Sequence, residues 1–246
     1  MQDQLFDLHD TTLCCMVLKR PVLVVSKHID ASLSRLRNVL HTLDQTIDNG
    51  GTDEKRKSGI EVIKLFDIEN QKSFANSIRK NKYPLIVVMR EEDKLEHKLQ
   101  IQFLIRYYHD IERGSRMSWP DKDLHVIKEK VNHISIHTEV QTYVYDLIVQ
   151  LRYSRFIKGG IPTPFLFELI ELVKFWAYVQ DKTFVTPLMV KECFRKALPH
   201  RLTLLEAEEE PTLLYGSNPV LVNQLVHAID VFDVLDIELS KVRPPI

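Results

Sequence analysis

The chain has few glycines, few cysteines and no long apolar run. Only 7 of its 246 residues are glycine, which argues against glycine-rich loops that bind phosphates through the backbone. Its 3 cysteines are Cys14, Cys15 and Cys193. Two are adjacent and the third stands alone, so the spacing fits neither a disulfide framework nor a zinc site. We expect buried, reduced thiols, as in an intracellular protein.

The charge is almost balanced. With 33 Lys and Arg against 34 Asp and Glu, the formal net charge is −1, so no whole-chain basic field attracts nucleic acid. No apolar run reaches the ~18–20 residues that a membrane helix needs. The first ten residues, MQDQLFDLHD, are acidic and polar, unlike a secretory signal. We expect an intracellular protein without a membrane partner, and the sequence does not distinguish nucleus from cytoplasm.

The strongest local signal is a strand, a turn and a helix near the N-terminal end. Val22–Val25 is a continuous apolar run that suits a buried parallel strand. Apolar residues from Leu33 to Leu40 then recur at helical spacing. A phosphate-binding turn would read GxxxxGK[ST], but the turn from Ser26 to Ser32 has no glycine and puts the anionic Asp30 where phosphate would lie. The frame of a nucleotide-binding unit is predicted without its phosphate-binding loop.

Strands and helices alternate through the first half of the chain. Strands are predicted at 60–65 and 84–89, and helices at 70–81 and 95–108. This alternation predicts an α/β fold, in which a parallel sheet is flanked by helices, over residues 1–120.

The second half, residues 121–246, is predicted to be helical from Thr138 onward, while 124–137 stays ambiguous between helix and strand. Thr186-Pro187 combines an N-cap residue with Pro at the first helical position, which is typical of a helix start. The helices predicted here are 140–156, 163–180, one that begins at Thr186-Pro187, and 219–229 as the last one.

Two short motifs stand at characteristic places in this helical half: Val185-Thr186-Pro187 and His200-Arg201-Leu202. With the helix between 163 and 180, they resemble the C-terminal lid of AAA+ ATPases of the MoxR and magnesium-chelatase type. The resemblance implies a degenerate AAA+, P-loop-like α/β domain over 1–120 and a lid-like domain with a C-terminal extension over 121–246.

The positions for catalysis depart from that family. Aligned on the strand 84–89, Met89 and Arg90 stand where acidic residues would hold Mg²⁺, and Glu91, Glu92 and Asp93 lie beyond the strand end. Pro164 stands where a lid arginine would contact the γ-phosphate. With the phosphate loop also missing, three parts of the phosphoryl-transfer machinery are absent from their expected places.

A second resemblance lies near the C-terminal end. The segments TLLYGSNP at 212–219 and LSKVRPPI at 239–246 resemble segments of a fungal family named maintenance of telomere capping protein 2. The family name implies a role in telomere capping and no known reaction, ligand or catalytic residue. Gly216–Pro219 reads as a turn whose Ser or Asn caps a helix. For Tyr215, a buried role and a partner-binding role both stay open.

Other polar groups have plain structural interpretations. His125, His133 and His137 have no Cys or paired carboxylate beside them, so surface or hydrogen-bonded histidines are expected rather than metal ligands. The basic run Lys55-Arg56-Lys57 adjoins Asp53-Glu54, which favours a solvated loop over a phosphate contact.

No G-x-S-x-G motif surrounds Ser26, Ser32 or Ser34, so capping and turn roles are expected in place of a nucleophile. The arginines that would form a basic stripe if two helices lay together are Arg35, Arg37, Arg152 and Arg155. A mixed-charge surface is the expected arrangement.

We therefore expect no catalytic, cofactor-binding or metal-binding residue and no cofactor. The leading hypothesis is a pseudo-ATPase, a non-enzymatic scaffold or adaptor that acts in telomere capping through protein partners. Nucleic acid would be contacted only indirectly or through a local basic patch. The alternatives are a nucleotide-sensing module that binds without hydrolysis, and a nucleic-acid-binding protein.

Overall fold

The structure is a computed structural model that describes residues 7–48, 60–68, 70–80, 84–109, 123–210, 213 and 215–245. The predicted loop with Lys55-Arg56-Lys57 lies outside these residues. The chain forms two compact units: a sheet unit from 1–135 with 174–183, and a helical unit from 136–173 with 184–246. Among the described residues, no helix has the length and apolar character to cross a membrane.

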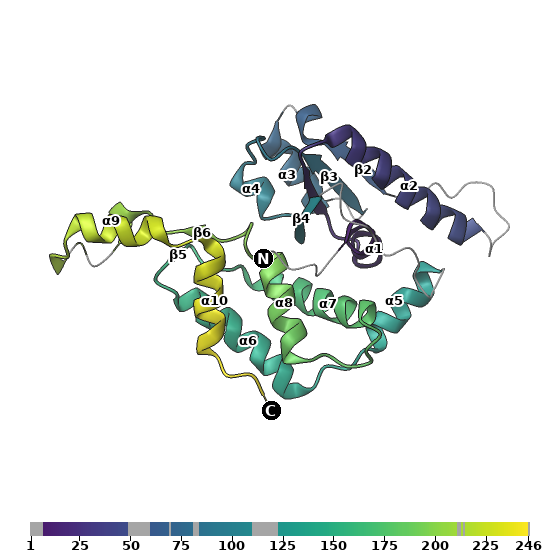
Figure 1. Ribbon diagram of the computed structural model, residues 1–246. Helices are drawn as coiled ribbons and strands as arrows, with labels where there is room; N and C mark the ends of the chain where they lie inside the picture. Colours follow the sequence, from purple (N-terminus) through teal and green to yellow (C-terminus); the bar gives the residue numbers. More distant parts are fainter. Residues whose placement is uncertain are drawn as a thin grey trace. The chain divides into compact units, whose positions relative to one another are not determined.

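The sheet unit is built on four parallel strands in the order β2-β3-β1-β4 (Figure 1). Val24 of the central β1 pairs with Val88 of β3 on one side and with Tyr107 of β4 on the other. This confirms the predicted α/β class with a parallel sheet. The strands are β1 (Val22–Ser26), β2 (Glu61–Lys64), β3 (Leu85–Met89) and β4 (Ile105–His109).

Helices cover this sheet and fill its core. All residues of β1 and β3 are buried, as expected of strands covered on both faces. The other elements of the sheet unit are α1 (Leu8–Leu18), α2 (Ile29–Asp48), η1 (Leu65–Asp67), α3 (Gln71–Lys80), α4 (His97–Gln100) and α5 (Leu124–His133). The ambiguity over 124–137 is settled in favour of a helix from Leu124 to His133, while 134–137 is not helical.

The predicted helix at 95–108 was wrong. Only the short α4 is helical there, and β4 begins at Ile105. Ile105, Tyr107 and His109 are buried whereas Tyr108 is exposed, the alternation of a strand with one covered face. Apolar residues at helical spacing pointed to a helix, but pairing with β1 decided the conformation.

The helical unit contains α6, most of α7, and α8 to α10. Thr186 caps α8 through its side chain, which accepts from the backbone N–H of Met189, and Pro187 is the first helical residue, as predicted. The elements are α6 (Thr138–Tyr153), β5 (Ile157–Lys158), α7 (Thr163–Val179), α8 (Pro187–Ala197), β6 (Thr203–Leu204), η2 (Ala207–Glu209), α9 (Pro219–Ala228) and α10 (Val231–Lys241).

The prediction that 219–229 is the last helix was wrong, because α10 follows after two residues. Asp230 begins α10 with a capping box: its side chain accepts from the backbone of the new helix, and the side chain of Asp233 accepts from Asp230 N–H. Val234, Leu235 and Leu239 of α10 are buried, and α10 packs on α6 and α8.

Candidate functional site

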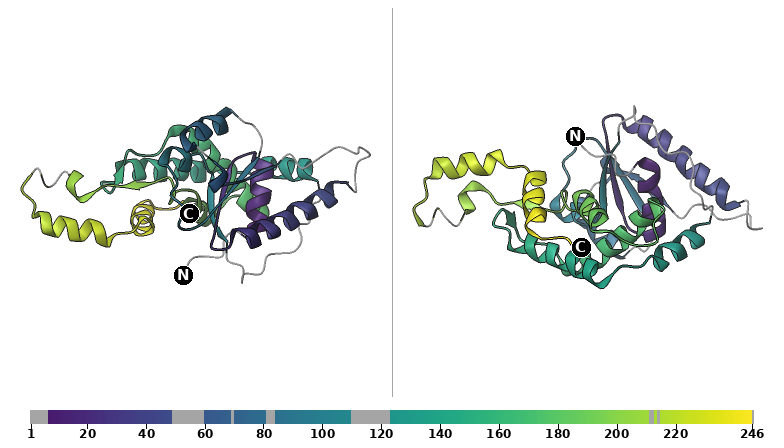
Figure 2. Two further views of the ribbon diagram at one scale, coloured as in Figure 1. Left: turned by 90° about the horizontal axis from the view of Figure 1, so that it is seen from above. Right: turned by 60° about the horizontal axis from the view of Figure 1, so that its bottom comes forward.

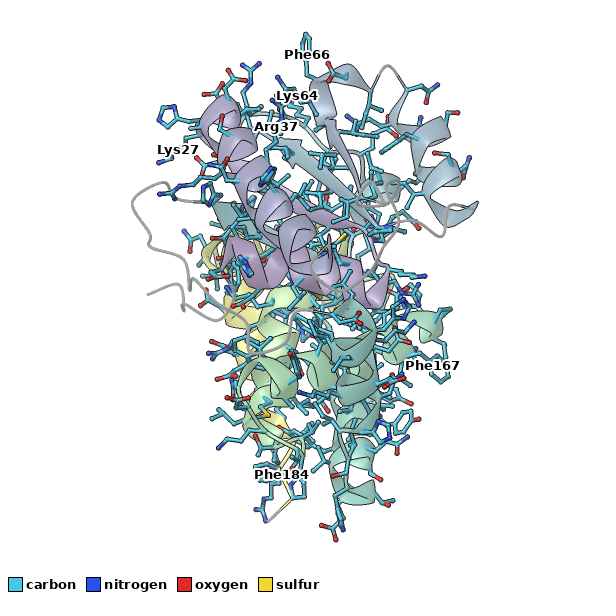
Figure 3. All side chains as sticks on the ribbon, turned by 90° about the vertical axis from the view of Figure 1, so that its right-hand side faces the viewer. Lys27, Arg37, Lys64, Phe66, Phe167 and Phe184 are labelled. Atoms are coloured by element: carbon cyan, nitrogen blue, oxygen red, sulfur yellow. The ribbon has the colours of Figure 1, made fainter. Side chains whose placement is uncertain are left out.

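A cleft lies at the edge of the sheet where β1, β2 and β3 end. It has a volume of about 460 Å³, and ligands of open α/β sheets bind at this carboxyl edge. Figure 3 shows Lys27, Lys64 and Phe66 at this end of the sheet unit. The cleft is lined by Lys27, His28, Ile29, Asp30, Ala31, Lys64, Phe66, Asp67 and Arg90.

The corner between β1 and α2 is short. β1 ends at Ser26 and α2 begins at Ile29, so only Lys27 and His28 connect them. The pattern GxxxxGK[ST], by contrast, needs eight residues. The structure thus places two residues where the sequence comparison looked for that pattern.

Two buried serines close this corner from inside. Ser26 Oγ accepts the backbone N–H of His28 at 3.2 Å, and it lies 2.6 Å from Ser32 Oγ. Ser32 Oγ is also 3.0 Å from the carbonyl of His28. The hydroxyl of Ser34 donates to the carbonyl of Asp30 at 2.8 Å. These contacts confirm local structural roles for the three serines. The backbone N–H of His28, in the turn, is hydrogen-bonded within the protein.

The cleft carries more positive than negative side chains. Lys27, Lys64 and Arg90 line it together with the carboxylates of Asp30 and Asp67. Lys64 Nζ lies 3.4 Å from Asp30 Oδ1, but these side chains are 42% and 95% exposed, so solvent weakens this ion pair. With the N-terminus of α2 beside them, the side chains can attract an anion.

Sequence reasoning missed Asp67. The alignment on β3 pointed to Met89, which is buried, and to Arg90, which lines the cleft. Asp93 accepts the backbone N–H of Arg90 at 2.9 Å and so stabilises the turn after β3. In the observed strand order, β2 lies next to β3, and the segment after β2 brings Asp67 to the cleft. The available signal was an acidic residue just after the mostly apolar segment 62–66.

The three histidines are exposed, as expected, and the side chains of two of them make local contacts. His133 Nδ1 lies 2.7 Å from the carbonyl of Glu129, and His137 caps α6 with Nδ1 3.4 Å from Glu139 N. His125 is exposed on α5. Within the described ranges, no three His, Cys, Asp or Glu side chains gather as a metal site.

The arginines considered for a basic stripe belong to different units. Arg35 and Arg37 lie on α2 of the sheet unit. Arg152 of the helical unit donates to the carbonyl of Ile161 at 3.0 Å, and Arg155 pairs with the buried Glu210. Arg152 and Arg155 thus stabilise their own unit.

The motif His200-Arg201-Leu202 has a packing role. Arg201 Nη2 lies 3.1 Å from Glu168 Oε2, and the guanidinium carbon lies 4.0 Å from the centre of the Phe165 ring. These contacts tie the end of α8 to α7, while Pro164 is exposed at the start of α7.

The thiols are buried and free, which confirms that part of the expectation. Burial raises the pKa of the Cys15 thiol to about 12, although a hydrogen bond with the backbone of Leu85 opposes the shift. Burial also raises the pKa of Cys193 well above its usual value. Because the thiolate is the nucleophile, these two cysteines are inert at neutral pH.

Comparison with known proteins first identifies the type of fold. A family model described as the AAA lid domain matches residues 167–218. A crystal structure from Cytophaga hutchinsonii, described as that of a "putative ATPase", superposes with a TM-score of 0.63 at 13% identity, over 96% of this chain and 89% of that one. The fold is therefore of the AAA type, a parallel-sheet unit combined with a helical lid.

Similar sequences then point to a particular protein family. Proteins named Maintenance of telomere capping protein 2 match at 31% identity over 172 residues in Kluyveromyces lactis and at 32% over 124 residues in Lachancea thermotolerans. The first alignment covers 68% of this chain and 60% of the relative, and the second 48% and 44%. The chain thus spans about three fifths of the first relative's length. The resemblance to this family is confirmed.

Proposed function

We propose that this chain acts in telomere capping as a non-enzymatic scaffold or adaptor with a degenerate AAA-type frame. The relatives' name supports the telomere role, and the short β1–α2 corner supports the absence of ATP hydrolysis. Because phosphoryl transfer depends on positioned charges and backbone donors, a corner closed by Ser26 and Ser32 provides little of what the reaction needs.

The roles of the two parts follow from this proposal. Residues 1–120 would form the degenerate α/β domain and residues 121–246 the lid-like domain with its extension. Partners would be proteins, with nucleic acid reached indirectly or through a local basic patch, and a role at chromosome ends would place the protein in the nucleus. No catalytic, cofactor-binding or metal-binding residue is assigned.

An ATPase assay on the purified chain with Mg²⁺ tests the non-enzymatic role. We expect phosphate release at the rate of the buffer blank, unchanged by Lys27→Ala or Asp67→Asn. Asp67→Asn matters because Asp67 is the carboxylate after β2 that lines the cleft. Hydrolysis that disappears in either variant would overturn the proposal.

A second candidate function is nucleotide sensing without hydrolysis. The cleft supports it: Lys27, Lys64 and Arg90 line a space of about 460 Å³ together with Phe66, which is 80% exposed. The cations can attract phosphates, and an exposed aromatic ring can stack on a base.

Isothermal titration with ATP, ADP and GTP separates the two candidates. Heat that is lost in the variant Lys27→Ala/Lys64→Ala/Arg90→Ala would support sensing at this cleft. Arg37→Ala on α2 is the matched control, because Arg37 does not line the cleft. Absence of heat at millimolar nucleotide would leave the scaffold role.

A further inference from the structure

We propose that α9 and its acidic surroundings form a docking surface for a basic amphipathic helix of a protein partner. The inference rests on the proposed scaffold function, because it names the chemical kind of partner that the scaffold would hold.

The helix α9 is apolar and uncovered. None of its residues is buried, and Val220, Leu221 and Leu225 are 63%, 59% and 59% exposed. Each such side chain stabilises a complex by about 1.5–3 kcal/mol when it is fully buried. Both views of Figure 2 show α9 projecting beyond α10 from the rest of the helical unit.

The helix is nevertheless held in place on one side. Val226 lines a small cavity with Phe156, Leu205 and Val234 of the same unit, and α9 packs on η2. Asn218 caps it by accepting the N–H of Val220 at 3.0 Å. Leu221 and Leu225 are four residues apart and lie on one face. A partner therefore meets a preformed apolar stripe, Leu221 to Leu225, about 6 Å long on a helix about 15 Å long.

The surroundings of α9 are acidic. From 203 to 240 the chain has no Lys or Arg. Cations from outside this stretch pair with four of its acids, in the pairs Lys158–Glu209, Arg155–Glu210, Arg195–Asp236 and Lys241–Glu238. The eight acidic residues of this stretch are Glu206, Glu208, Glu209, Glu210, Asp230, Asp233, Asp236 and Glu238.

The negative charge around α9 determines which kind of partner can bind there. Glu206, Glu208 and Asp230 form no ion pair within the described part of the chain. A second copy of this chain would bring like charges together, and an anionic membrane would be repelled. A partner helix with Lys and Arg beside its apolar stripe complements both features of the surface.

Tyr215 adds an aromatic side chain just before α9. It is 89% exposed, so the alternative of a buried role is excluded. The residue precedes the turn at Gly216, whose φ is +86°, a conformation that suits glycine. Exposed tyrosines are typical anchors of protein interfaces.

Fluorescence anisotropy with the full chain tests the proposal. The probe is a labelled 18-residue amphipathic helix of Leu and Lys, and a Leu and Glu helix of the same pattern is its counterpart. We expect the Lys peptide to bind, more weakly as salt rises. Leu221→Asp/Leu225→Asp should weaken binding at least tenfold, and Glu206→Lys/Glu208→Lys several-fold.

Phe167→Asp/Leu188→Asp is the matched control, because these side chains of α7 and α8 are 62% and 66% exposed in the same unit. It should bind within twofold of the unmodified chain, and circular dichroism should show both double variants folded.

Equal binding of the Glu peptide, or unchanged binding by the α9 variant, would overturn the proposal. So would an α9-dependent dimer in sedimentation, or α9-dependent binding to phosphatidylcholine vesicles, without peptide binding. None of these results touches the scaffold role, which the ATPase assay tests separately.

Discussion

Two short helices of similar apolar character have opposite environments in this molecule. α1 has 11 residues, of which ten are buried, from Leu8 to Val17. α9 has 10 residues and none is buried. Neither contains Lys or Arg. α1 contacts α2, α5 and three strands of the sheet, whereas α9 leaves its Leu221 and Leu225 face in solvent. The comparison separates apolar surface that builds the fold from apolar surface left for a partner.

The largest expected effect comes from truncating one leucine in each helix. Leu13→Ala in α1 removes a side chain that is 0% exposed and should lower the free energy of unfolding by about 3 kcal/mol. Leu225→Ala in α9 should change it by no more than about 0.5 kcal/mol. Urea unfolding followed by circular dichroism measures both, and similar losses would contradict the comparison.

Thiol reactivity provides a second test of the contrast between the buried α1 and the exposed α9. The native chain should react slowly with Ellman's reagent, since its cysteines are buried and burial raises the pKa of Cys15 to about 12. Leu225→Cys should react at least about 100-fold faster, because its thiol would be exposed. The folded chain holds the Cys15 proton more tightly than the unfolded chain, in which the thiol pKa is about 9. The free energy of unfolding should therefore be highest below that pH and fall as the pH rises above it. Fast reaction of Cys14 or Cys15 near pH 7 would refute a buried α1.

A smaller effect on stability is expected in the packed part of the helical unit. Glu238 of α10 is buried, and burial alone would raise its pKa. Hydrogen bonds from Gln150, Lys241 and Ser154 outweigh burial and hold the pKa below its usual value. Its stabilising effect is therefore present above about pH 4.5 and is lost as pH falls through the lowered pKa.

Glu238→Gln should accordingly cost about 1–2 kcal/mol at pH 7 and progressively less below pH 4.5. Urea unfolding of both chains at pH 7 and pH 3 checks this. A cost that is the same at both pH values would show that the carboxylate charge does not anchor α10 to α6.

The smallest effect is expected at the sheet-edge cleft. Lys64→Ala breaks the exposed pair with Asp30 and should change stability by less than about 0.5 kcal/mol. A larger loss in thermal unfolding would mean that the cleft residues support the fold, and the triple variant of the binding test would then need a structural control.

Local pattern predicted much of this fold. The apolar runs at Val22 and Leu85 are strands, and Thr186-Pro187 begins a helix. The error at β4 arose because Leu95, Leu99 and Phe103 repeat at helical spacing, while the strand is specified by pairing with β1. α1 escaped prediction because it is buried on nearly every side and His9 to Thr12 are polar, which leaves no periodic apolar pattern to detect.

The candidate site was predictable only in part. A turn without glycine at Ser26–Ser32 led to the prediction that the phosphate loop is missing, and the structure adds a hydrogen bond between Ser26 and Ser32 in this turn. Asp67 was missed because strand order, which puts the end of β2 beside the cleft, is not written in local sequence. The exposure of Tyr215 and α9 was equally inaccessible, since an apolar helix in a sequence normally indicates core.

Allele replacement in the organism that carries this chain is the most direct test of the central claim, that function resides in protein contacts and not in a nucleotide cycle. The readout is single-stranded telomeric DNA, measured by hybridisation without denaturation. We predict that Leu221→Asp/Leu225→Asp raises this signal as much as deletion does, while Lys27→Ala/Lys64→Ala/Arg90→Ala leaves it at the wild-type level. A raised signal in the cleft variant with a normal one in the α9 variant would contradict the account.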